Sequence, residues 1–281
     1  MSVSGFCGGH RLGAIPSVPD KRDFSLSRLM GGTAFARRSK FSLFDRYPKI
    51  RNQGDRGSCG PHAACWCMGL HAAMEGVRAD LSPLFAYWTT RYLMGALGRD
   101  SGVDNRKMAK ALMKFGACFE ADHGYELPLD QKPSRDAFRR GLKWQIKMGG
   151  YGWARTAAEA KGAIDVLNQP LIIAVPVYES FESPETMKTG FIPMPNTKSE
   201  KLLGYHDMAI CGFDDNSRNG DFQLVNSWGS DVGDGGKFIL SYDYPITEMM
   251  VIKESETGED ADDGSELSGV SLWWRKLRGM A

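Results

Sequence analysis

The sequence predicts an α+β fold, because helical patterns come first along the chain and strand patterns follow. Three helical patterns lie between residues 58 and 116, and four strand-like runs lie between residues 171 and 242. No internal repeat is visible, and 281 residues suffice for one large domain or two lobes with an ample core. The order of these elements is typical of a protein in which helices and a mostly antiparallel sheet occupy separate regions.

The first helix is predicted over residues 58–76, directly after a glycine-rich loop. Ser58 is expected to cap it, since serine is favoured at this position. A second helix begins near Ser82, the expected cap, with Pro83 in its first turn. A third, amphipathic helix runs over 104–116 and is closed by Gly116. Further helices are predicted over 134–147 and 157–167.

The strands are predicted in the second half of the chain. Residues 171–177 form a continuous apolar run, which indicates a buried strand. A strand over 204–213 has His206 near its start and a turn at Asp214-Asp215-Asn216 at its end. Two more strands are predicted over 222–225 and 236–242.

Composition and charge exclude several classes of function. The chain is 42% hydrophobic and 25% charged, which is ordinary for a globular protein. Its net charge of +1 gives no argument for binding nucleic acid or a membrane surface. The sequence has no apolar run of the length that a transmembrane helix needs, and residues 1–7 lack the apolar core of a signal peptide. We therefore expect a cytoplasmic protein.

The two ends differ in composition from the middle. Residues 1–48 are rich in Gly, Ser and Pro, and we expect an arm that packs along the domain or a short removable pro-segment. Residues 254–268 are acidic and almost free of apolar side chains, which predicts a flexible linker. Residues 269–281 are basic and contain Trp273 and Trp274. This segment is expected to dock on a partner, on the same chain or on a membrane surface, or to be an unstructured tail.

Cys59 is the candidate nucleophile. It stands at the start of the first predicted helix, where the partial positive charge of the helix favours thiolate over thiol. That effect is worth only ~1 kcal/mol, so a strong nucleophile also needs a base. His206 lies near the start of one predicted strand, and Asn226 lies at the end of another. The order Cys, His, Asn is the one that a Cys–His–Asn site needs.

With these residues the chain resembles the papain-like cysteine peptidases of the C1 type, in particular their compact bacterial and viral members. Three motifs in order carry the resemblance, which spans about residues 13–253; His206 follows Cys59 by 147 residues, within the family's usual spacing, and Asn226 is slightly late. The matching stretches are Gln53 with Gly57-Ser58-Cys59, His206 on its strand, Asn226-Ser227-Trp228-Gly229 with Gly233 and Gly235-Gly236, and an N-terminal stretch from Ile15-Pro16 to Asp20-Lys21-Arg22-Asp23.

The resemblance implies a two-lobe fold, with a helical lobe over about 49–150, a β-rich, barrel-like lobe over about 151–253 and the active-site cleft between them. It implies hydrolysis of peptide bonds in a protein or peptide substrate through a thioester, without a cofactor. Cys59 would be the nucleophile and His206 the base and acid, oriented by Asn226. Gln53 would donate to the oxyanion together with the Cys59 backbone N–H. The viral members make association with a virus or phage a further expectation.

Trp228 and Asp207 are the expected substrate-side residues. Trp228 would shield the contact between His206 and Asn226 from water, or simply be a core tryptophan. Asp207 stands where the family usually has a small residue, and by analogy we expect it to favour a basic side chain in the pocket for the second residue before the cut. The alternative is that Asp207 pairs with a nearby Lys or Arg. The chain also departs from the family in having Gly60 after the nucleophile and Val232 where a second Trp is usual.

The remaining cysteines and histidines do not predict a metal site. A single helix presents only two or three ligands to one tetrahedral ion, so the group on the first predicted helix fails this test. Its Cys65 and Cys67 are expected to be small buried hydrophobic residues. The six cysteines are not spaced as a disulfide framework, which fits a reducing compartment. The residues considered as ligands are Cys59, His62, Cys65, Cys67 and His71.

Two other functions use the same residues. A transferase or isopeptidase would use Cys59 and His206 on a different acyl acceptor. A non-catalytic structural or docking module would retain the fold alone, although a scaffold has no physical need for Cys59, His206, Asn226 and Gln53 together.

Overall fold

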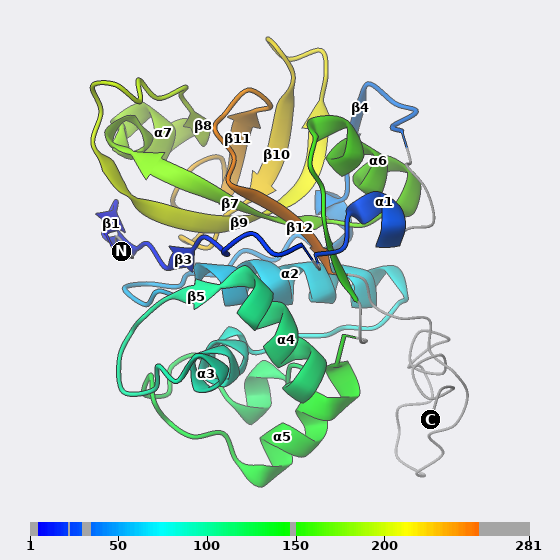
Figure 1. Ribbon diagram of the computed structural model, residues 1–281, viewed down its shortest axis with the longest axis vertical. Coiled ribbons are helices and arrows are strands. Elements are labelled where there is room, and N and C mark those ends of the chain that lie inside the picture. Colours follow the sequence, from blue (N-terminus) through cyan, green and yellow to red (C-terminus); the bar gives the residue numbers. More distant parts are fainter. Residues whose placement is uncertain (1–4, 22, 30–34, 147–149, 253–281) are drawn as a thin grey trace.

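The computed structural model describes residues 5–21, 23–29, 35–146 and 150–252. A helical region and a β-rich region lie on opposite sides of helix α2, which runs through the middle of the molecule (Figure 1). This arrangement confirms the predicted α+β fold of two lobes. Within the described ranges, no helix combines the length and the hydropathy that crossing a membrane requires. The predictions for 254–268 and 269–281 concern residues outside the described part of the chain.

The helices follow the predicted order. Ser82 caps α3 by accepting a hydrogen bond from the Phe85 backbone N–H at 3.0 Å, and Gly116 follows the last residue of α4. The helix predicted over 134–147 is shorter, because it ends at Gly141 and a 3-10 helix follows. The helices are α1 (Leu26–Leu29), α2 (Cys59–Met74), α3 (Pro83–Met94), α4 (Asn105–Phe115), α5 (Arg135–Gly141), α6 (Ala157–Leu167) and α7 (Pro184–Thr189), with 3-10 helices at Phe44–Arg46, Glu120–Asp122, Leu142–Trp144 and Glu179–Glu182.

The β-rich lobe is built on one large sheet with the strand order β6-β12-β7-β9-β10-β11-β8, to which β4 adds beside β9. Its pairs are antiparallel except for β11 with β8. The strands are β4 (Lys40–Ser42), β6 (Tyr151–Trp153), β7 (Leu171–Tyr178), β8 (Phe191–Ile192), β9 (Leu202–Asp214), β10 (Asp221–Val225), β11 (Lys237–Ser241) and β12 (Glu248–Ile252).

The hydrophobic core is continuous from α2 into this sheet. Helix α2 is buried over nearly its whole length, because it packs on β9 on one side and on α3 on the other. Strand β7 is likewise buried at seven of its eight positions, in agreement with the continuous apolar run of its sequence. Cys65 and Cys67 are part of this core, and all six cysteines are free thiols. The start of α2 and the middle of β9 are therefore held in fixed positions relative to each other.

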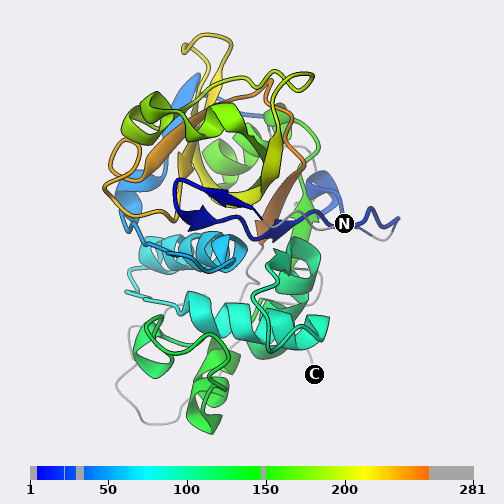
Figure 2. The same ribbon diagram turned by 90° about the vertical axis from the view of Figure 1, so that its left-hand side faces the viewer.

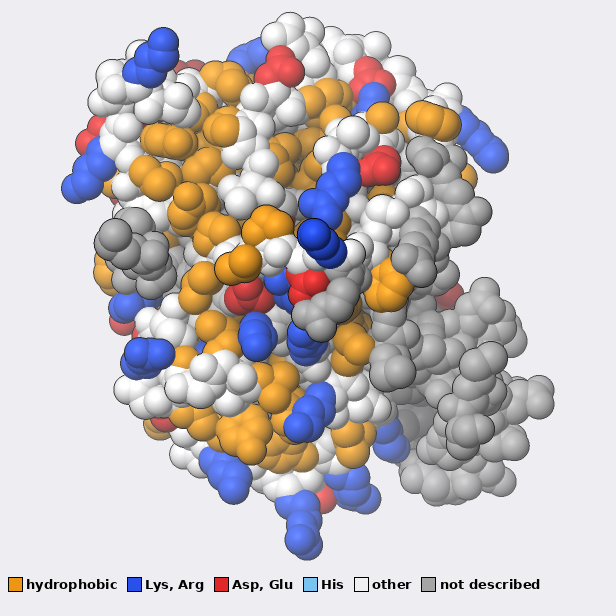
Figure 3. Space-filling model, viewed as in Figure 1, with side chains coloured by type: hydrophobic (Ala, Val, Ile, Leu, Met, Phe, Trp, Pro, Cys, Tyr) orange, Lys and Arg blue, Asp and Glu red, His pale blue; other side chains and the backbone are white. Residues whose placement is uncertain are grey.

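The N-terminal arm lies along the boundary between the two lobes. It contains β1 (Phe6–Cys7), β2 (His10–Arg11) and β3 (Ala14–Ile15), and β3 pairs in parallel with β5 (Val103–Asp104). Figure 2 shows these blue strands between α2, in cyan, and the sheet above it. Further along, Asp23 forms an ion pair with Arg106 of α4 at 2.6 Å. On the face drawn in Figure 3, acidic and basic side chains stand close together near the middle of the molecule, between two more apolar regions.

Candidate active site

Cys59 is the first residue of α2 and is fully buried. Ser58 occupies the N-cap position, but its side chain makes no capping hydrogen bond, so this part of the prediction was wrong. The Ser58 hydroxyl instead shares a 2.6 Å hydrogen bond with the hydroxyl of Tyr125. The first backbone N–H groups of α2 are therefore left without a side-chain acceptor from Ser58, at the end of the helix where a negative charge is favoured.

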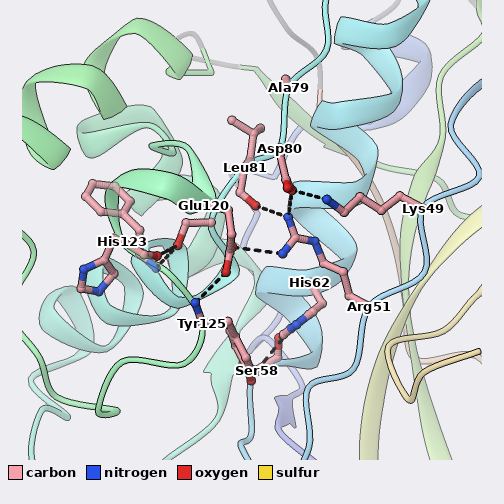
Figure 4. A network of polar contacts seen from close by, with 12 residues as sticks. Lys49, Arg51, Ser58, His62, Ala79, Asp80, Leu81, Glu120, His123 and Tyr125 are labelled. Carbon is pink, nitrogen blue, oxygen red and sulfur yellow. Dashed lines mark hydrogen bonds and ion pairs between the residues drawn. The ribbon is translucent and has the colours of Figure 1, made fainter.

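A polar network fixes the loop that leads to Cys59 (Figure 4). The Arg51 guanidinium contacts the carboxylates of Asp80 and Glu120, the latter at 3.0 Å. Glu120 in turn accepts a hydrogen bond from the Tyr125 backbone N–H at 2.6 Å. The Tyr125 hydroxyl reaches back to the loop, where it donates to the Gln53 carbonyl at 2.8 Å. Because the network joins the loop to the helical lobe at several points, the loop presents Cys59 in a defined position.

His206 and Asn226 form the second half of the site. His206 lies on β9, Asn226 directly follows β10, and His206 Nε2 is 2.7 Å from Asn226 Oδ1. Asn226 Oδ1 also accepts the Ser227 backbone N–H at 2.8 Å, which fixes the orientation of the amide. Because this oxygen can only accept, Nε2 carries the hydrogen of the neutral ring. Nδ1 is buried without a hydrogen-bond partner among the described residues, so it is left as the free acceptor.

Trp228 covers the contact between His206 and Asn226. Its ring centroid is 4.7 Å from that of His206, and the Trp228 side chain is fully buried. Burial lowers the pKa of His206 to about 4, although the hydrogen bond to Asn226 acts in the opposite direction. The imidazole is therefore neutral at pH 7 in this state of the molecule.

Cys59 lies beside the same strand. Its sulfur is 3.9 Å from Oδ2 of Asp207, the residue that follows His206 on β9. Burial raises the pKa of the Cys59 thiol and the nearby Asp207 carboxylate raises it further, while hydrogen bonds from backbone groups of Asp207, Gly13 and Gly60 lower it. Burial dominates, so Cys59 is a neutral thiol here and the pair does not exist as thiolate and imidazolium.

Gln53 does not present a free amide to the site. Its Nε2 donates to the carbonyls of Arg11 at 2.9 Å and Arg56 at 2.7 Å, and its Oε1 accepts from the Ser227 hydroxyl at 2.7 Å. The side chain is fully buried. The donor that we predict for the oxyanion thus already holds a carbonyl oxygen, which belongs to the N-terminal arm.

The arm covers the site from its outer side. The His10 ring stacks on Trp228 with centroids 5.2 Å apart, and the Gly13 carbonyl accepts the Val103 backbone N–H at 2.8 Å. A β-carbon on Gly13 would lie 2.1 Å from the Gly57 carbonyl oxygen, so the backbones touch and only glycine fits. A backbone group of Gly13 also forms a hydrogen bond with the Cys59 thiol, so the arm lies against Cys59, which is completely buried.

Asp207 is fully buried, and burial raises its pKa to about 8. Asn105 Nδ2 donates to Asp207 Oδ1 at 2.9 Å and also lies 3.2 Å from Glu248 Oε2, so the two acidic side chains share one amide. No described Lys or Arg forms an ion pair with Asp207, which excludes the alternative that it pairs with a nearby Lys or Arg. Among the described residues, no group of three His, Cys, Asp or Glu side chains could hold a metal ion.

The chain is similar to known cysteine peptidases in both sequence and structure. The structure matches xylellain, a cysteine protease from Xylella fastidiosa, with a TM-score of 0.76 and 27% sequence identity over 90% of this chain and 97% of that one. A peptidase C1-like protein of Acanthamoeba polyphaga mimivirus is 28% identical over 265 residues, which is 85% of this chain and 83% of the viral protein. The sequence relatives and structure neighbours of the chain are papain-like C1 cysteine peptidases. No family model matches the sequence.

Two further proteins resemble the chain, one in sequence and one in fold. Cysteine proteinase 3 of Entamoeba histolytica is 27% identical over 198 residues, which is 67% of this chain and 59% of that protein. Procathepsin L 3 of Tenebrio molitor has the same fold, with a TM-score of 0.63 at 15% identity.

Sequence reasoning missed several residues of this papain-like site. His10, Arg11 and Gly13 contact it from an arm with no helical or strand periodicity, so no local pattern signals their position. Asp100 was missed as well. It lies in the loop before β5, yet it accepts the Gly57 backbone N–H two residues before Cys59.

Proposed function

We propose that this chain hydrolyses peptide bonds through Cys59, with His206 as base and acid, Asn226 as the residue that orients it, and Gln53 as an oxyanion donor. The observation that carries the proposal is the state of His206. One ring nitrogen is held by Asn226 at 2.7 Å, while the other is a buried acceptor without a hydrogen-bond partner in the described part of the chain. The strand that carries His206 packs against α2, with Asp207 beside Cys59. A histidine so arranged can accept a proton at Nδ1 without losing its orientation.

Acylation begins with a proton transfer. His206 Nδ1 takes the proton of Cys59, and the thiolate adds to the carbonyl carbon of the substrate. The oxyanion accepts hydrogen bonds from the Cys59 backbone N–H and Gln53 Nε2. The C–N bond then breaks as the imidazolium returns its proton to the leaving amine, which gives a thioester. Water, deprotonated by His206, hydrolyses the thioester and restores the thiol.

The proposal includes a covered state and an open one. A substrate carbonyl needs the Gln53 N–H that now holds the Arg11 carbonyl, so the arm has to leave before substrate binds. We therefore assign the described part of the arm around Arg11, residues 5–15, as a covering segment, whether it is displaced or cleaved. When water enters, the burial that keeps Cys59 and His206 neutral is relieved, and proton transfer between them becomes easier.

Covalent labelling tests the proposal. A peptidyl chloromethyl ketone should alkylate Cys59 in the full-length chain, with the site located by peptide mass spectrometry. His206→Ala should lower both the labelling and the turnover of a fluorogenic peptide amide, whereas Cys118→Ala, at a buried cysteine outside the site, should retain both. Labelling that is spread over several cysteines and does not depend on His206 would contradict the proposal.

A further inference from the structure

Arg11 of the arm makes two contacts with the site at once. Its backbone carbonyl accepts a hydrogen bond from Gln53 Nε2 at 2.9 Å. Its guanidinium reaches Asp100, with Nε 3.4 Å from Oδ2 and Nη2 donating to the Asp100 carbonyl at 3.0 Å. The residue whose carbonyl occupies the proposed oxyanion donor is therefore a basic residue, and its side chain is paired with a carboxylate.

Asp100 is held firmly in relation to the nucleophile. Both of its carboxylate oxygens lie 3.1 Å from the Gly57 backbone nitrogen, and the Tyr87 hydroxyl donates to Oδ1. Tyr87 is fully buried on α3, and Gly57 is two residues before Cys59. The Asp100 side chain retains 16% of its exposure, so the carboxylate is largely enclosed but can still be reached from the side where Arg11 lies. Such a fixed carboxylate needs little reorganisation to receive a cation.

Departure of the arm would leave this carboxylate without its cationic partner. The contacts from Gly57 and Tyr87 would remain, but a largely enclosed negative charge gains from a new positive group. A guanidinium from a substrate can reproduce the ion pair with the Asp100 carboxylate and the hydrogen bond to the Asp100 carbonyl. The arm residues that follow Arg11 towards β3 are Leu12 and Gly13, which carry no charge. The charge on the arm at this point is thus confined to the one residue that lies on the oxyanion donor.

We propose that Asp100 forms a specificity subsite for a basic side chain, and that Arg11 is the intramolecular occupant of this subsite. The inference rests on the proposed function: the substrate residue whose carbonyl Cys59 attacks takes the place of Arg11 and places an arginine or lysine side chain on Asp100. The arm and the preferred substrate then compete for the same two contacts. The Asp100 carboxylate therefore both selects the substrate and holds the N-terminal arm over the site.

Two fluorogenic peptide amides test the subsite in the full-length chain. They differ only in having arginine or citrulline, its uncharged analogue, as the residue before the cut. We expect kcat/KM to be about two- to fivefold higher for the arginine peptide, as is typical of a partly screened ion pair, and the ratio should fall as salt is added. Asp100→Asn keeps an acceptor for Gly57 and Tyr87 and should bring the ratio close to one. Asp136→Asn, which removes a carboxylate exposed on α5, should leave the ratio as in the wild type.

A binding measurement separates this proposal from the catalytic one. The Cys59→Ala chain cannot turn over, so fluorescence anisotropy of the same two peptides reports recognition alone, and the Kd should be lower for the arginine peptide. Equal kcat/KM and equal Kd for the two peptides, or binding of neither, would overturn the subsite. An arginine preference in binding without any labelling of Cys59 would instead overturn the proposed function and keep the subsite. If Asp100→Asn fails to fold, the comparison of the two peptides on the wild-type chain still decides.

Discussion

The carboxyl group of Asp207 fills the space beside Gly60, so that a β-carbon on Gly60 would lie 2.9 Å from Asp207 Oδ2. The family usually has an aromatic residue at the position of Gly60 and a small residue at that of Asp207. The two departures from the pattern are therefore one change in packing: the smaller residue on α2 makes room for the larger one on β9.

Gly60→Ala should accordingly destabilise the wild-type chain. In a helix, alanine is intrinsically favoured over glycine by about 1 kcal/mol, but an overpacked buried site typically costs ~1–3 kcal/mol. Truncating the acid in Asp207→Ala removes the nearest clash, although Val103 Cγ2 at 3.0 Å remains. Urea unfolding should therefore show that Gly60→Ala lowers the free energy of unfolding less in the Asp207→Ala background than in the wild type. An equal cost in both backgrounds would show that the two residues are independent.

Much of the fold could be predicted because its signals are local. Ser82 and Gly116 sit at helix ends where capping chemistry places them, and the apolar run at 171–177 is a buried strand. Cys59 and His206 could be proposed as site residues for the same reason, since each stands near the beginning of an element with strong periodicity. The burial of Cys59 and His206 in the folded chain could not be predicted from such local signals.

The cover over the site could not be predicted, because it depends on contacts between residues far apart in the sequence. Arg11 and Gln53 are distant along the chain, and the Gly13 backbone fits against Gly57 only in three dimensions. Ser58 shows the same limit on a smaller scale: its sequence position is that of a cap, but a hydrogen bond to Tyr125 takes its hydroxyl. Tertiary partners outcompeted the local preference there.

Asn226→Ala should lower activity with little change in the fold. The substitution removes the acceptor that holds His206 Nε2 at 2.7 Å, and this acceptor also stabilises the imidazolium formed during the reaction. A hydrogen bond to a charged group is worth about 1.5–3 kcal/mol, which corresponds to a loss of about ten- to a hundredfold in kcat/KM. Measurement of kcat/KM and of the Tm on the same samples checks this. A loss of activity that simply follows a loss of folded protein would contradict the role of Asn226.

Asp207 should make the stability of the fold depend on pH. Burial raises its pKa from 3.8 to about 8, so between these values the folded chain binds a proton that the unfolded chain releases. The contribution of Asp207 to stability is therefore fully present below pH 3.8 and is lost as the pH rises to about 8. Cys59 and Glu248 lie nearby, and burial raises the pKa of each, so they add to the same trend at their own pH.

Asp207→Asn isolates that contribution, since asparagine does not titrate. The free energy of unfolding of the wild type, minus that of Asp207→Asn, should decrease as the pH rises from 5 towards 8 and should then level off. Urea titrations at several pH values measure it. A difference that does not depend on pH would mean that Asp207 is ionised in the folded chain at all of these pH values.

Gly13→Val should open the site. Any side chain at Gly13 meets the Gly57 carbonyl, which is backbone and cannot move aside, so the covered arrangement loses stability relative to the open one. An overpacking cost of ~1–3 kcal/mol would raise the rate at which iodoacetamide alkylates Cys59 at pH 7 by about tenfold or more. Val18→Ala, at an arm residue that is 77% exposed, serves as the control and should react like the wild type. The increase in alkylation rate over wild type should become smaller at higher pH, because burial raises the pKa of the Cys59 thiol only while the arm covers it. If Gly13→Val and wild type react equally at every pH, the arm does not limit access to Cys59.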